Sequence, residues 1–241
     1  MRVIAIVQAR MGSTRLPGKV MLDVCGRPAI WHLMEQLNYA SLLDDVVLAT
    51  TTESADNKLS RYAEQQGWNV YRGSEDDVLD RYYEAALDIG CVSGDVVVRV
   101  TGDDILADPE IIDQVIKLYT SNQPQVKHAS NNRVSTYPYG SDVEVFAFEA
   151  LEQAWRQATS DEEREHVTPY IRNNPEAFPY VDVRSPEDLS HVRLSIDYPE
   201  DLEFNRRLFQ AMYQLGSPPF HLEDILRCIE MYGITHQGVP A

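Results

Sequence analysis

The fold is decided by residues 3–19, which read Val3-Ile4-Ala5-Ile6-Val7-Gln8-Ala9-Arg10-Met11-Gly12-Ser13-Thr14-Arg15-Leu16-Pro17-Gly18-Lys19. The run from Val3 to Val7 is short, continuous and β-branched, which is typical of a strand buried on both faces of a parallel sheet. A loop punctuated by glycine and proline follows over residues 8–26. Pro28 then opens a helix whose apolar side chains recur at helical spacing. This order of strand, loop and helix is the first unit of an α/β fold.

The same order recurs along the first half of the chain. Strands are predicted at residues 45–50, from residue 69, and at residues 95–100. Helices are predicted at residues 54–66, 74–87 and 109–118, with Ser54, Ser74 and Asp108 as candidate N-caps. Alternating strands and helices imply a doubly wound, mostly parallel sheet, whose ligand lies outside the carboxyl ends of the strands.

Beyond residue 120 the alternation changes. Residues 142–146 alternate between polar and apolar side chains and predict an antiparallel or mixed-edge strand. A strand is also predicted at residues 193–196, and helices at residues 148–158, 164–172, 199–215 and 222–231. This part is expected to complete the sheet and cover the ligand site.

The chain is acidic overall but basic at its start. Among 241 residues, 21 are Lys or Arg and 38 are Asp or Glu, so the formal net charge is −17. Hydrophobic residues make up 44%, enough for a sizeable core, which excludes a natively disordered chain. Residues 1–30 carry one acid, Asp23, and the basic residues Arg2, Arg10, Arg15, Lys19 and Arg27. The overall charge argues against nucleic-acid binding, and the local excess predicts one small anionic ligand.

Cysteine spacing and hydropathy point to the cytoplasm. Cys25, Cys91 and Cys228 are widely separated and odd in number, so neither a disulfide framework nor a zinc ribbon is expected. The first apolar run is interrupted by Gln8 and Arg10, too early for a signal peptide or a membrane span. We expect a cytoplasmic protein with no membrane partner.

The loop after the first strand has the chemistry of a triphosphate clamp. It is not a Walker A loop, because Gly12 and Gly18 are one residue too far apart and Val20 replaces the Ser or Thr. No Gly-x-Gly-x-x-Gly fingerprint is present either. Glycines let the backbone approach an anion, while hydroxyls and three cations can surround phosphate oxygens. A solvated basic surface loop is the alternative interpretation.

Residues 9–19 carry a resemblance to a known family. The segment Ala-Arg-x-x-Ser-x-Arg-Leu-Pro-Gly-Lys is similar to the signature of cytidylyltransferases that activate acidic sugars such as Kdo and sialic acids. The chain resembles in particular the SpsF-like spore-coat polysaccharide branch, through residues 72–82, 137–146, 163–170 and 197–203. Gln8 departs from the pattern, because better-characterised acidic-sugar enzymes have Pro there, so the identity of the sugar does not carry over.

The resemblance implies a fold and an activity. The fold is the Rossmann-like sheet of nucleotide-diphospho-sugar transferases, with a nucleotidyltransferase domain at residues 1–216, an acceptor or dimer region at 130–175 within it, and a helical extension at 217–241. The activity is transfer of CMP from CTP to a sugar or sugar-acid acceptor, with release of pyrophosphate. A homodimer is expected from the same resemblance.

The resemblance also assigns roles to residues. Catalysis is expected from Arg10, Arg15, Lys19 and Asp103. Nucleotide binding is expected from Ala9, Arg10, Gly12, Ser13, Arg15, Lys19, Thr50, Thr51, Asp80 and Thr101. Acceptor binding is expected from Arg81, Arg133, Tyr139, Asp142, Glu144, Glu165 and His166. Asp80 and Arg81 could instead be a solvated pair on a helix, and His166 a structural histidine.

Two carboxylates are candidate magnesium ligands. Asp103 follows the strand at residues 95–100, and in the resembling family the Asp of this Gly-Asp segment binds Mg²⁺. Asp197 resembles the second ligand and precedes Pro199, so it could instead only cap a helix. Mg²⁺ prefers one or two carboxylates together with substrate phosphates and water, which this pair would provide.

Two other functions fit parts of the sequence. A GT-A-type glycosyltransferase has a similar sheet and an acidic metal site, but Asp103 and Asp104 are adjacent rather than spaced as Asp-x-Asp. A non-catalytic nucleotide-binding scaffold would not need the pair of acids. Nucleotidyl transfer is therefore the leading hypothesis.

Overall fold

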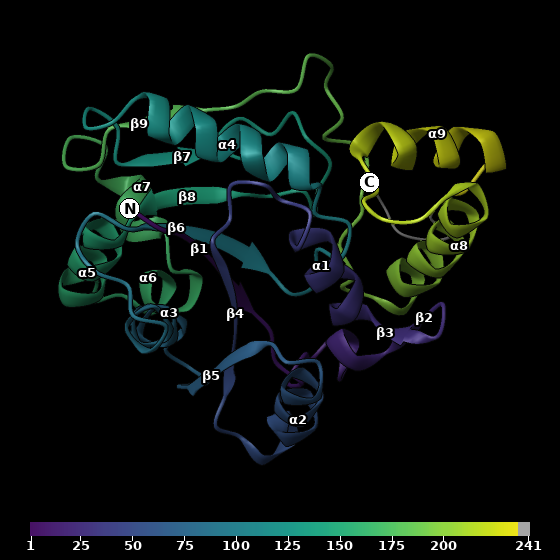
Figure 1. Cartoon of the computed structure of the whole chain (residues 1–241), viewed down its shortest axis with the longest axis horizontal. Coiled ribbons are helices and arrows are strands. Elements are labelled where there is room, and N and C mark those ends of the chain that lie inside the picture. Colours follow the sequence, from purple (N-terminus) through teal and green to yellow (C-terminus); the bar gives the residue numbers. More distant parts are fainter. Residues whose placement is uncertain (236–241) are drawn as a thin grey trace.

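A computed structural model describes residues 1–235 as a seven-stranded sheet covered by helices on both faces (Figure 1). The strand order is β5-β4-β1-β6-β8-β7-β9. The strands are β1 (Val3–Gln8), β4 (Asp45–Thr51), β5 (Asn69–Gly73), β6 (Val96–Thr101), β7 (His128–Ser130), β8 (Glu144–Ala147) and β9 (Tyr180–Asp182). A separate small hairpin is formed by β2 (Asp23–Val24) and β3 (Arg27–Pro28).

The helices are, in order, α1 (Ala29–Leu37), α2 (Asn57–Gln65), α3 (Val78–Asp88), α4 (Pro109–Ser121), α5 (Phe148–Gln157), α6 (Asp161–His166), α7 (Pro169–Asn173), α8 (Pro199–Leu215) and α9 (Leu222–Tyr232). Two short 3₁₀ helices, η1 (Lys19–Met21) and η2 (Ser54–Asp56), precede α1 and α2. None of the helices within residues 1–235 is long and apolar enough to cross a membrane.

The predicted doubly wound, mostly parallel sheet is confirmed. β1 pairs in parallel with both β4 and β6, while β8 is antiparallel to β6 and β7. After β1 the chain adds strands on one side of the sheet (β4 and β5), and after β6 it adds them on the other side (β7, β8 and β9). The loops that follow β1 and β6 therefore diverge, and a crevice opens at the carboxyl ends of these two strands. That crevice lies between Gln8 and Thr101, which are register partners.

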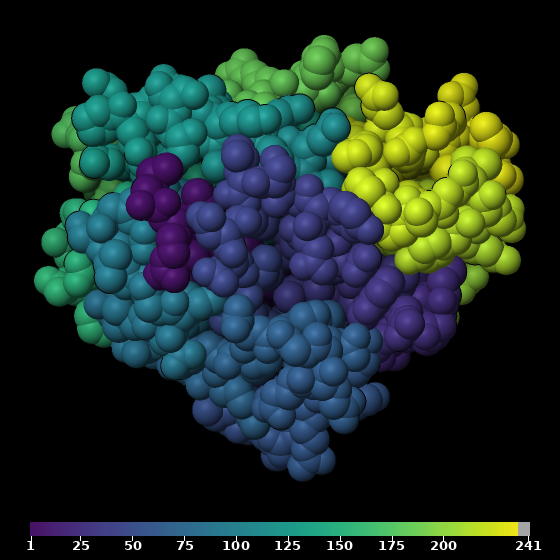
Figure 2. Space-filling view, viewed as in Figure 1, coloured from purple at the N-terminus to yellow at the C-terminus, as the bar shows by residue number. Residues whose placement is uncertain are grey.

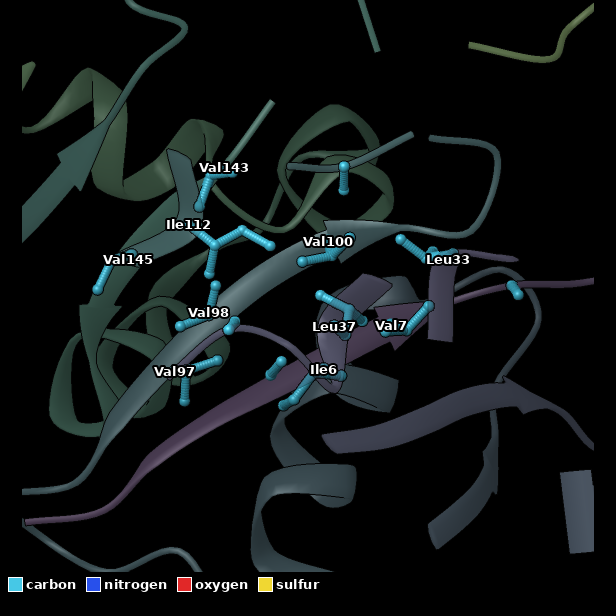
Figure 3. Close-up of a cluster of buried hydrophobic side chains, with 14 of the residues drawn as sticks. Ile6, Val7, Leu33, Leu37, Val97, Val98, Val100, Ile112, Val143 and Val145 are labelled. Atoms are coloured by element: carbon cyan, nitrogen blue, oxygen red, sulfur yellow. The ribbon is translucent and has the colours of Figure 1, made fainter. Parts of the chain in front are cut away.

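Both faces of the sheet are buried, and each packs against its own helices. Val98 and Val100 of β6 lie on the face covered by α1 and α4, where Leu33 and Ile112 contact the core (Figure 3). α3, α5 and α6 lie together on the other face (Figure 1). Val97 is buried there, but Arg99, two residues later on the same face, is charged. Arg99 therefore lies at the boundary between the hydrophobic core and the ligand site.

Several predicted boundaries were wrong for identifiable reasons. The helix predicted at residues 164–172 is two helices, α6 and α7, because Val167 adopts φ 71° and Thr168 precedes Pro169, which disfavours helical backbone. No strand forms at residues 193–196, where a single bridge joins Arg193 to Tyr139. β8 is antiparallel, but it lies inside the sheet rather than at its edge.

Two predicted N-caps were also wrong. Ser54 caps nothing and begins η2. The cap of α3 is Asp77, whose carboxylate accepts from the Asp80 N–H at 2.8 Å, while the Ser74 hydroxyl accepts from the Asp77 N–H. The predicted cap Asp108 is confirmed before α4.

The C-terminal helices pack beside the N-terminal hairpin. α8 and α9 lie side by side, and α8 contacts β2 (Figure 1). In the space-filling view their yellow atoms abut the violet-blue atoms of the region around α1 (Figure 2). The Gln36 amide donates to the Phe220 carbonyl at 2.6 Å and accepts from the Phe220 N–H at 2.8 Å. The predicted extension at 217–241 is thus tied to α1, except that residues 236–241 lie outside the described residues.

Candidate active site

A cavity of about 600 Å³ lies at the carboxyl ends of β1 and β6. This volume falls in the usual range for small-molecule sites, roughly 300–1,000 Å³. Its lining includes the loop after β1, the turn after β6, one end of α3, and α6. The segments around Tyr139 and Asp197 complete it. The cavity therefore occupies the crevice that the strand order predicts.

The loop after β1 is fixed by hydrogen bonds to the buried Asp56 carboxylate and within the loop itself. The Met11 N–H donates to the Asp56 carboxylate at 2.6 Å, and the Gly18 N–H donates to the Met11 carbonyl at 2.9 Å. Gly18 has φ 70°, a conformation that glycine adopts without strain. Asp56 is 2% exposed and also accepts from the Thr51 backbone. The basic side chains are therefore carried by a rigid loop.

Asp103 is positioned by a close approach between two backbones. A Cβ on Gly102 would lie 2.7 Å from the Ala9 Cβ and 2.8 Å from the Gln8 carbonyl, so only glycine fits. The Gly102 N–H donates to that same Gln8 carbonyl at 2.8 Å. The turn after β6 is thus held against the start of the basic loop, and Asp103 faces Lys19.

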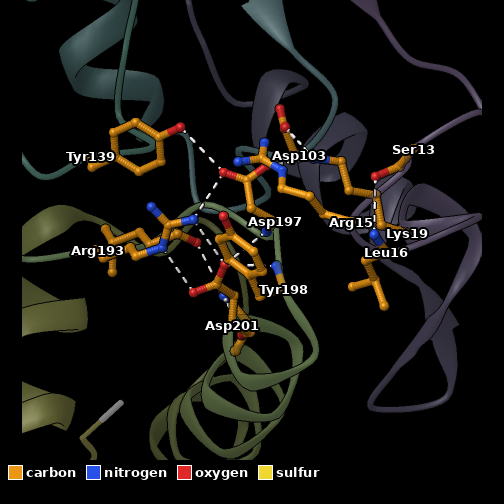
Figure 4. Close-up of polar contacts among 12 residues, drawn as sticks. Ser13, Arg15, Leu16, Lys19, Asp103, Tyr139, Arg193, Asp197, Tyr198 and Asp201 are labelled. Carbon is orange, nitrogen blue, oxygen red and sulfur yellow. Dashed lines mark hydrogen bonds and ion pairs between the residues drawn. The ribbon is translucent and has the colours of Figure 1, made fainter. Parts of the chain in front are cut away.

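Lys19 joins the two predicted metal carboxylates (Figure 4). Its Nζ lies 2.5 Å from Asp103 Oδ2 and 2.9 Å from Asp197 Oδ1. Arg15 Nη2 lies 2.5 Å from the same Asp197 oxygen. Because one ammonium contacts both carboxylates, their oxygens are close enough to share a cation.

Asp197 is surrounded by donors. Its Oδ2 accepts from Arg193 Nη2 at 2.9 Å and from the Tyr139 hydroxyl at 3.2 Å (Figure 4). Burial alone would raise its pKa, but Lys19, Arg15 and Arg193 outweigh burial and lower it. Burial would likewise lower the pKa of Lys19, and Asp103 and Asp197 raise it. Both groups are held in their charged forms.

Asp201 supports Asp197 from the first turn of α8. Its carboxylate accepts from the backbone N–H groups of Asp197 and Tyr198, at 2.8 and 2.9 Å. It also forms a two-point ion pair with Arg193, which then reaches Asp197. The helix-capping role that Asp197 could have filled belongs to Tyr198 and Asp201 instead. Asp197 is therefore left to face the cavity.

Most of the predicted site residues meet in this cavity. Its lining includes Ala9, Arg10, Gly12, Ser13, Arg15, Lys19, Arg81, Thr101, Asp103, Tyr139, Asp142, Glu165, His166 and Asp197. Five predicted residues lie outside the lining: Thr50, Thr51, Asp80, Arg133 and Glu144.

Each of those five residues is buried in the fold or contacts another side chain away from the cavity. Thr50 and Thr51 are buried in β4, and Thr51 binds Asp56. Asp80 accepts from the Trp155 indole at 2.8 Å, and the Arg133 guanidinium lies 3.6 Å from the ring centre of Tyr180. Glu144 lies behind the cavity wall, paired with Arg99.

Arg81, which was predicted to bind the acceptor, lies close to Arg10 in the cavity wall. It is 2% exposed, and its guanidinium donates to the backbone carbonyls of Ser74 and Glu75. Arg10 donates to the same Glu75 carbonyl at 3.3 Å. Within residues 1–235 Arg81 has no carboxylate partner, and burial, with Arg10 close by, lowers its pKa. Arg81 lies at the end of the cavity near Arg10.

The sequence analysis did not assign Arg99 or Ser195 to the site, and both line the cavity. Asp104, a weaker candidate metal carboxylate than Asp103, lines it as well. Arg99 carried a signal, because it is a charged residue within the apolar strand from Val96 to Thr101. Asp104 is buried next to Asp103. Its pKa is raised, mainly by burial and also by the negative charge of Asp103. Nothing in the sequence marks Ser195.

Comparison with known proteins gives a consistent result. The cytidylyltransferase family model matches residues 4–220. The chain is 41% identical to the uncharacterized protein MJ1063 of Methanocaldococcus jannaschii, over 84% of this chain and 81% of that protein. It is 34% identical to the spore coat polysaccharide biosynthesis protein SpsF of Bacillus subtilis, over 86% of each.

Solved structures point to the same family. A cytidylyltransferase from Leptospira borgpetersenii superposes with a TM-score of 0.91 at 32% identity, and all of both chains is covered. CMP:2-keto-3-deoxy-manno-octonic acid synthetase, complexed with CTP, shares the fold with a TM-score of 0.65 at 18% identity, over 87% of this chain and 99% of that one. The chain, whose basic loop and paired acids lie at the switch point of the sheet, belongs to the cytidylyltransferase family.

Proposed function

We propose that this cytidylyltransferase transfers CMP from CTP to a hydroxyl of a sugar or sugar acid, with Mg²⁺ and with release of pyrophosphate, in the synthesis of a polysaccharide or glycan. The observation that carries the proposal is the contact of Lys19 with both Asp103 and Asp197. A basic loop built for phosphates thereby meets a pair of acids suited to a metal. The polysaccharide role of SpsF and the CTP bound by the octonic acid synthetase support it.

The residues present fit a magnesium ion. Carboxylate oxygens are hard ligands, and those of Asp103 and Asp197 already converge on one cation, the Lys19 ammonium. No group of three or more His, Cys, Asp or Glu side chains in residues 1–235 is arranged to hold a metal. Such a pair suits Mg²⁺, which usually takes only one or two carboxylates alongside phosphates and water. When bound, Mg²⁺ would neutralise charge on the nucleotide phosphates.

The protein's own groups supply positioning and charge. Arg10, Ser13, Arg15 and Lys19 surround the place where the β and γ phosphates would lie, and their positive charge stabilises the departing pyrophosphate. Fixing CTP and acceptor in one cavity lets the acceptor oxygen attack the α phosphorus in line. The bond to pyrophosphate breaks as the bond to the acceptor oxygen forms, and the hydroxyl proton passes to solvent or a nearby base.

Ligand binding would change the partners of the basic loop. Arg15 and Lys19 bind the carboxylates, and the Arg15 side chain is half exposed. With phosphates and a metal present, these cations are free to turn toward the nucleotide. We therefore expect CTP and Mg²⁺ to bind cooperatively.

Calorimetry with CTP, UTP, ATP and GTP tests the proposal. We expect selective CTP binding that depends on Mg²⁺ and is weakened by Arg15→Ala and Asp103→Asn. Release of pyrophosphate with sugar-acid acceptors would then establish turnover. Binding of a nucleotide sugar without any free nucleotide would contradict the proposal. The homodimer stays a prediction, and sedimentation velocity tests it.

A further inference from the structure

The two carboxylate oxygens of Asp197 contact different groups (Figure 4). Oδ1 lies 2.9 Å from the Lys19 ammonium, which also contacts Asp103. Oδ2 instead accepts from Arg193 Nη2 at 2.9 Å and from the Tyr139 hydroxyl at 3.2 Å. Oδ1 is therefore the oxygen that shares a cation with the second candidate metal ligand, while Oδ2 is bound to the wall of the site.

Arg193 is itself held by a second carboxylate. Asp201 Oδ1 accepts from Arg193 Nε at 2.8 Å, and Asp201 Oδ2 accepts from Arg193 Nη2 at 2.9 Å. The Asp201 side chain is fully buried. Because Nη2 carries two N–H groups, it donates to Asp201 and to Asp197 at once. A planar guanidinium bound along one edge has a fixed orientation, so its contact with Asp197 has a fixed direction.

Two tyrosine rings lie against the guanidinium of Arg193. Its central carbon is 4.6 Å from the ring centre of Tyr139 and 5.8 Å from that of Tyr198, within the range of cation–π attraction. The hydrogen bond to Asp201, with the charge of Asp197, raises the pKa of Arg193, although burial lowers it. Arg193 is therefore a fixed, charged donor.

Arg193 acts on a ligand only through Asp197. Asp197 and Tyr139 line the cavity, whereas Arg193 and Asp201 are not part of its lining within residues 1–235. The contact with Oδ2 affects which divalent cations fit. Ca²⁺ takes about six to eight oxygens and often both oxygens of one carboxylate, whereas Mg²⁺ demands about six ligands in near-octahedral geometry. A carboxylate whose second oxygen is already bound to a guanidinium suits Mg²⁺ better.

We propose that Arg193, held by Asp201, is a positioning residue that keeps Oδ2 of Asp197 away from the metal and leaves Oδ1 to bind it, so that the site prefers Mg²⁺ to Ca²⁺. Tyr139 assists through its hydroxyl. This inference rests on the proposed function and deepens it, because it names the residue that selects the cation accompanying CTP.

The first test measures the Kd of CTP by calorimetry with Mg²⁺, with Ca²⁺ and without a divalent cation. Arg193→Lys keeps the positive charge beside Asp201 but removes the planar edge that reaches both aspartates. In the wild type we expect Mg²⁺ to tighten CTP binding more than Ca²⁺ does. In Arg193→Lys the gain from Mg²⁺ should fall about tenfold, as when an indirect partner of a metal ligand is lost. The gain from Ca²⁺ should change less than about threefold, since both oxygens of Asp197 become available to it.

The second test needs no nucleotide. Mn²⁺ also prefers oxygen ligands, and EPR spectroscopy measures how much of it the protein binds without CTP. Competition with Mg²⁺ and with Ca²⁺ then reports the selectivity of the site directly. We expect Mg²⁺ to displace Mn²⁺ at lower concentrations than Ca²⁺ in the wild type, and this preference to be lost in Arg193→Lys. Tyr139→Phe removes the other donor to Oδ2 and should shift the preference in the same direction, by less.

Arg227→Lys is the matched control, because Arg227 also pairs with an aspartate, Asp224 at 2.5 Å, but is 60% exposed on α9. It should leave both measurements unchanged. Urea unfolding shows whether Arg193→Lys keeps its fold, and Tyr139→Phe decides the question if it does not.

An equal loss of the Mg²⁺ and Ca²⁺ gains in Arg193→Lys would show a merely structural role and overturn the inference. Failure of the wild type to bind Mn²⁺, with or without CTP, would overturn it as well. If the wild type binds Mn²⁺ but no CTP, the proposed function fails, while the competition between Mg²⁺ and Ca²⁺ still decides the role of Arg193.

Discussion

Asp103 and Asp197 share one ammonium group, that of Lys19, although they follow different segments of the chain. Asp103 ends the turn after β6, and Asp197 precedes α8. The Lys19 ammonium thus lies between the two carboxylates. This arrangement makes the three residues interdependent, so substitutions in them test the site directly.

Lys19→Met is expected to lower the rate of pyrophosphate release by about 100- to 1,000-fold, the usual loss when one charge-stabilising donor is removed from a transition state. The measurement is a coupled pyrophosphate assay with a sugar-acid acceptor. Lys58→Met is the control, because Lys58 is exposed on α2. Full activity of Lys19→Met would show that Lys19 does not contact the phosphates.

Asp197→Asn is expected to weaken Mg²⁺-dependent CTP binding by at least about tenfold, since even indirect partners of a metal site cost that much. It removes a charge that Lys19, Arg15 and Arg193 all contact. Calorimetry with and without Mg²⁺ measures the effect, and Asp88→Asn, on the exposed side of α3, is the control. Equal Mg²⁺ dependence in wild type and Asp197→Asn would exclude Asp197 as a ligand.

Gly102→Ala is expected to reduce both stability and activity. The added Cβ would meet Ala9 and the Gln8 carbonyl at under 3 Å, and overpacking of this kind costs about 1–3 kcal/mol. Urea unfolding measures the stability, and the pyrophosphate assay the activity. Gly216→Ala should be neutral, because a Cβ there meets no atom within 4 Å. A fully stable Gly102→Ala would contradict the close approach.

The C-terminal helix is expected to be attached more firmly at low pH. His221 Nδ1 lies 3.0 Å from Asp108, and the Leu222 N–H donates to the same carboxylate at 2.7 Å. Burial alone would lower the pKa of His221, but Asp108, with Glu110 and Asp224, raises it above its ordinary value of 6.5. The pair therefore contributes fully below that ordinary value, and its contribution is lost as the pH rises through the raised pKa.

Urea unfolding of the wild type and His221→Gln across this pH range measures the effect. Below the ordinary pKa of histidine, we expect the free energy of unfolding of the wild type to exceed that of His221→Gln by up to about 1 kcal/mol, as for other partly exposed ion pairs. Above the raised pKa of His221, the difference should vanish. His191→Gln, at an exposed position, should show no such trend. A pH-independent difference would mean that His221 acts through packing rather than charge.

Five strands (β1, β4, β5, β6 and β8) and most helices could be predicted because they depend on local patterns, whereas the short strands β2, β3, β7 and β9 were not predicted. Residues Val3 to Val7 are apolar throughout, and Asp108 and Pro109 mark the start of α4 by chemistry that lies within two residues. The helix predicted at residues 164–172 failed for a local reason too, since Pro169 disfavours helical backbone at Thr168. The strand predicted at residues 193–196 failed for a non-local reason, because within residues 1–235 a single bridge, between Arg193 and Tyr139, is all the strand pairing that the segment finds.

By itself, the sequence determined the α/β order of elements, the basic loop and its place after the first strand, because each follows from side chains close together in the chain. Only the tertiary structure decided which distant side chains meet. It brought Asp197 to Lys19, placed Arg81 beside Arg10, and set Arg99 against Glu144. Such pairings depend on strand register and on the crossing of distant segments, which no spacing along the chain specifies.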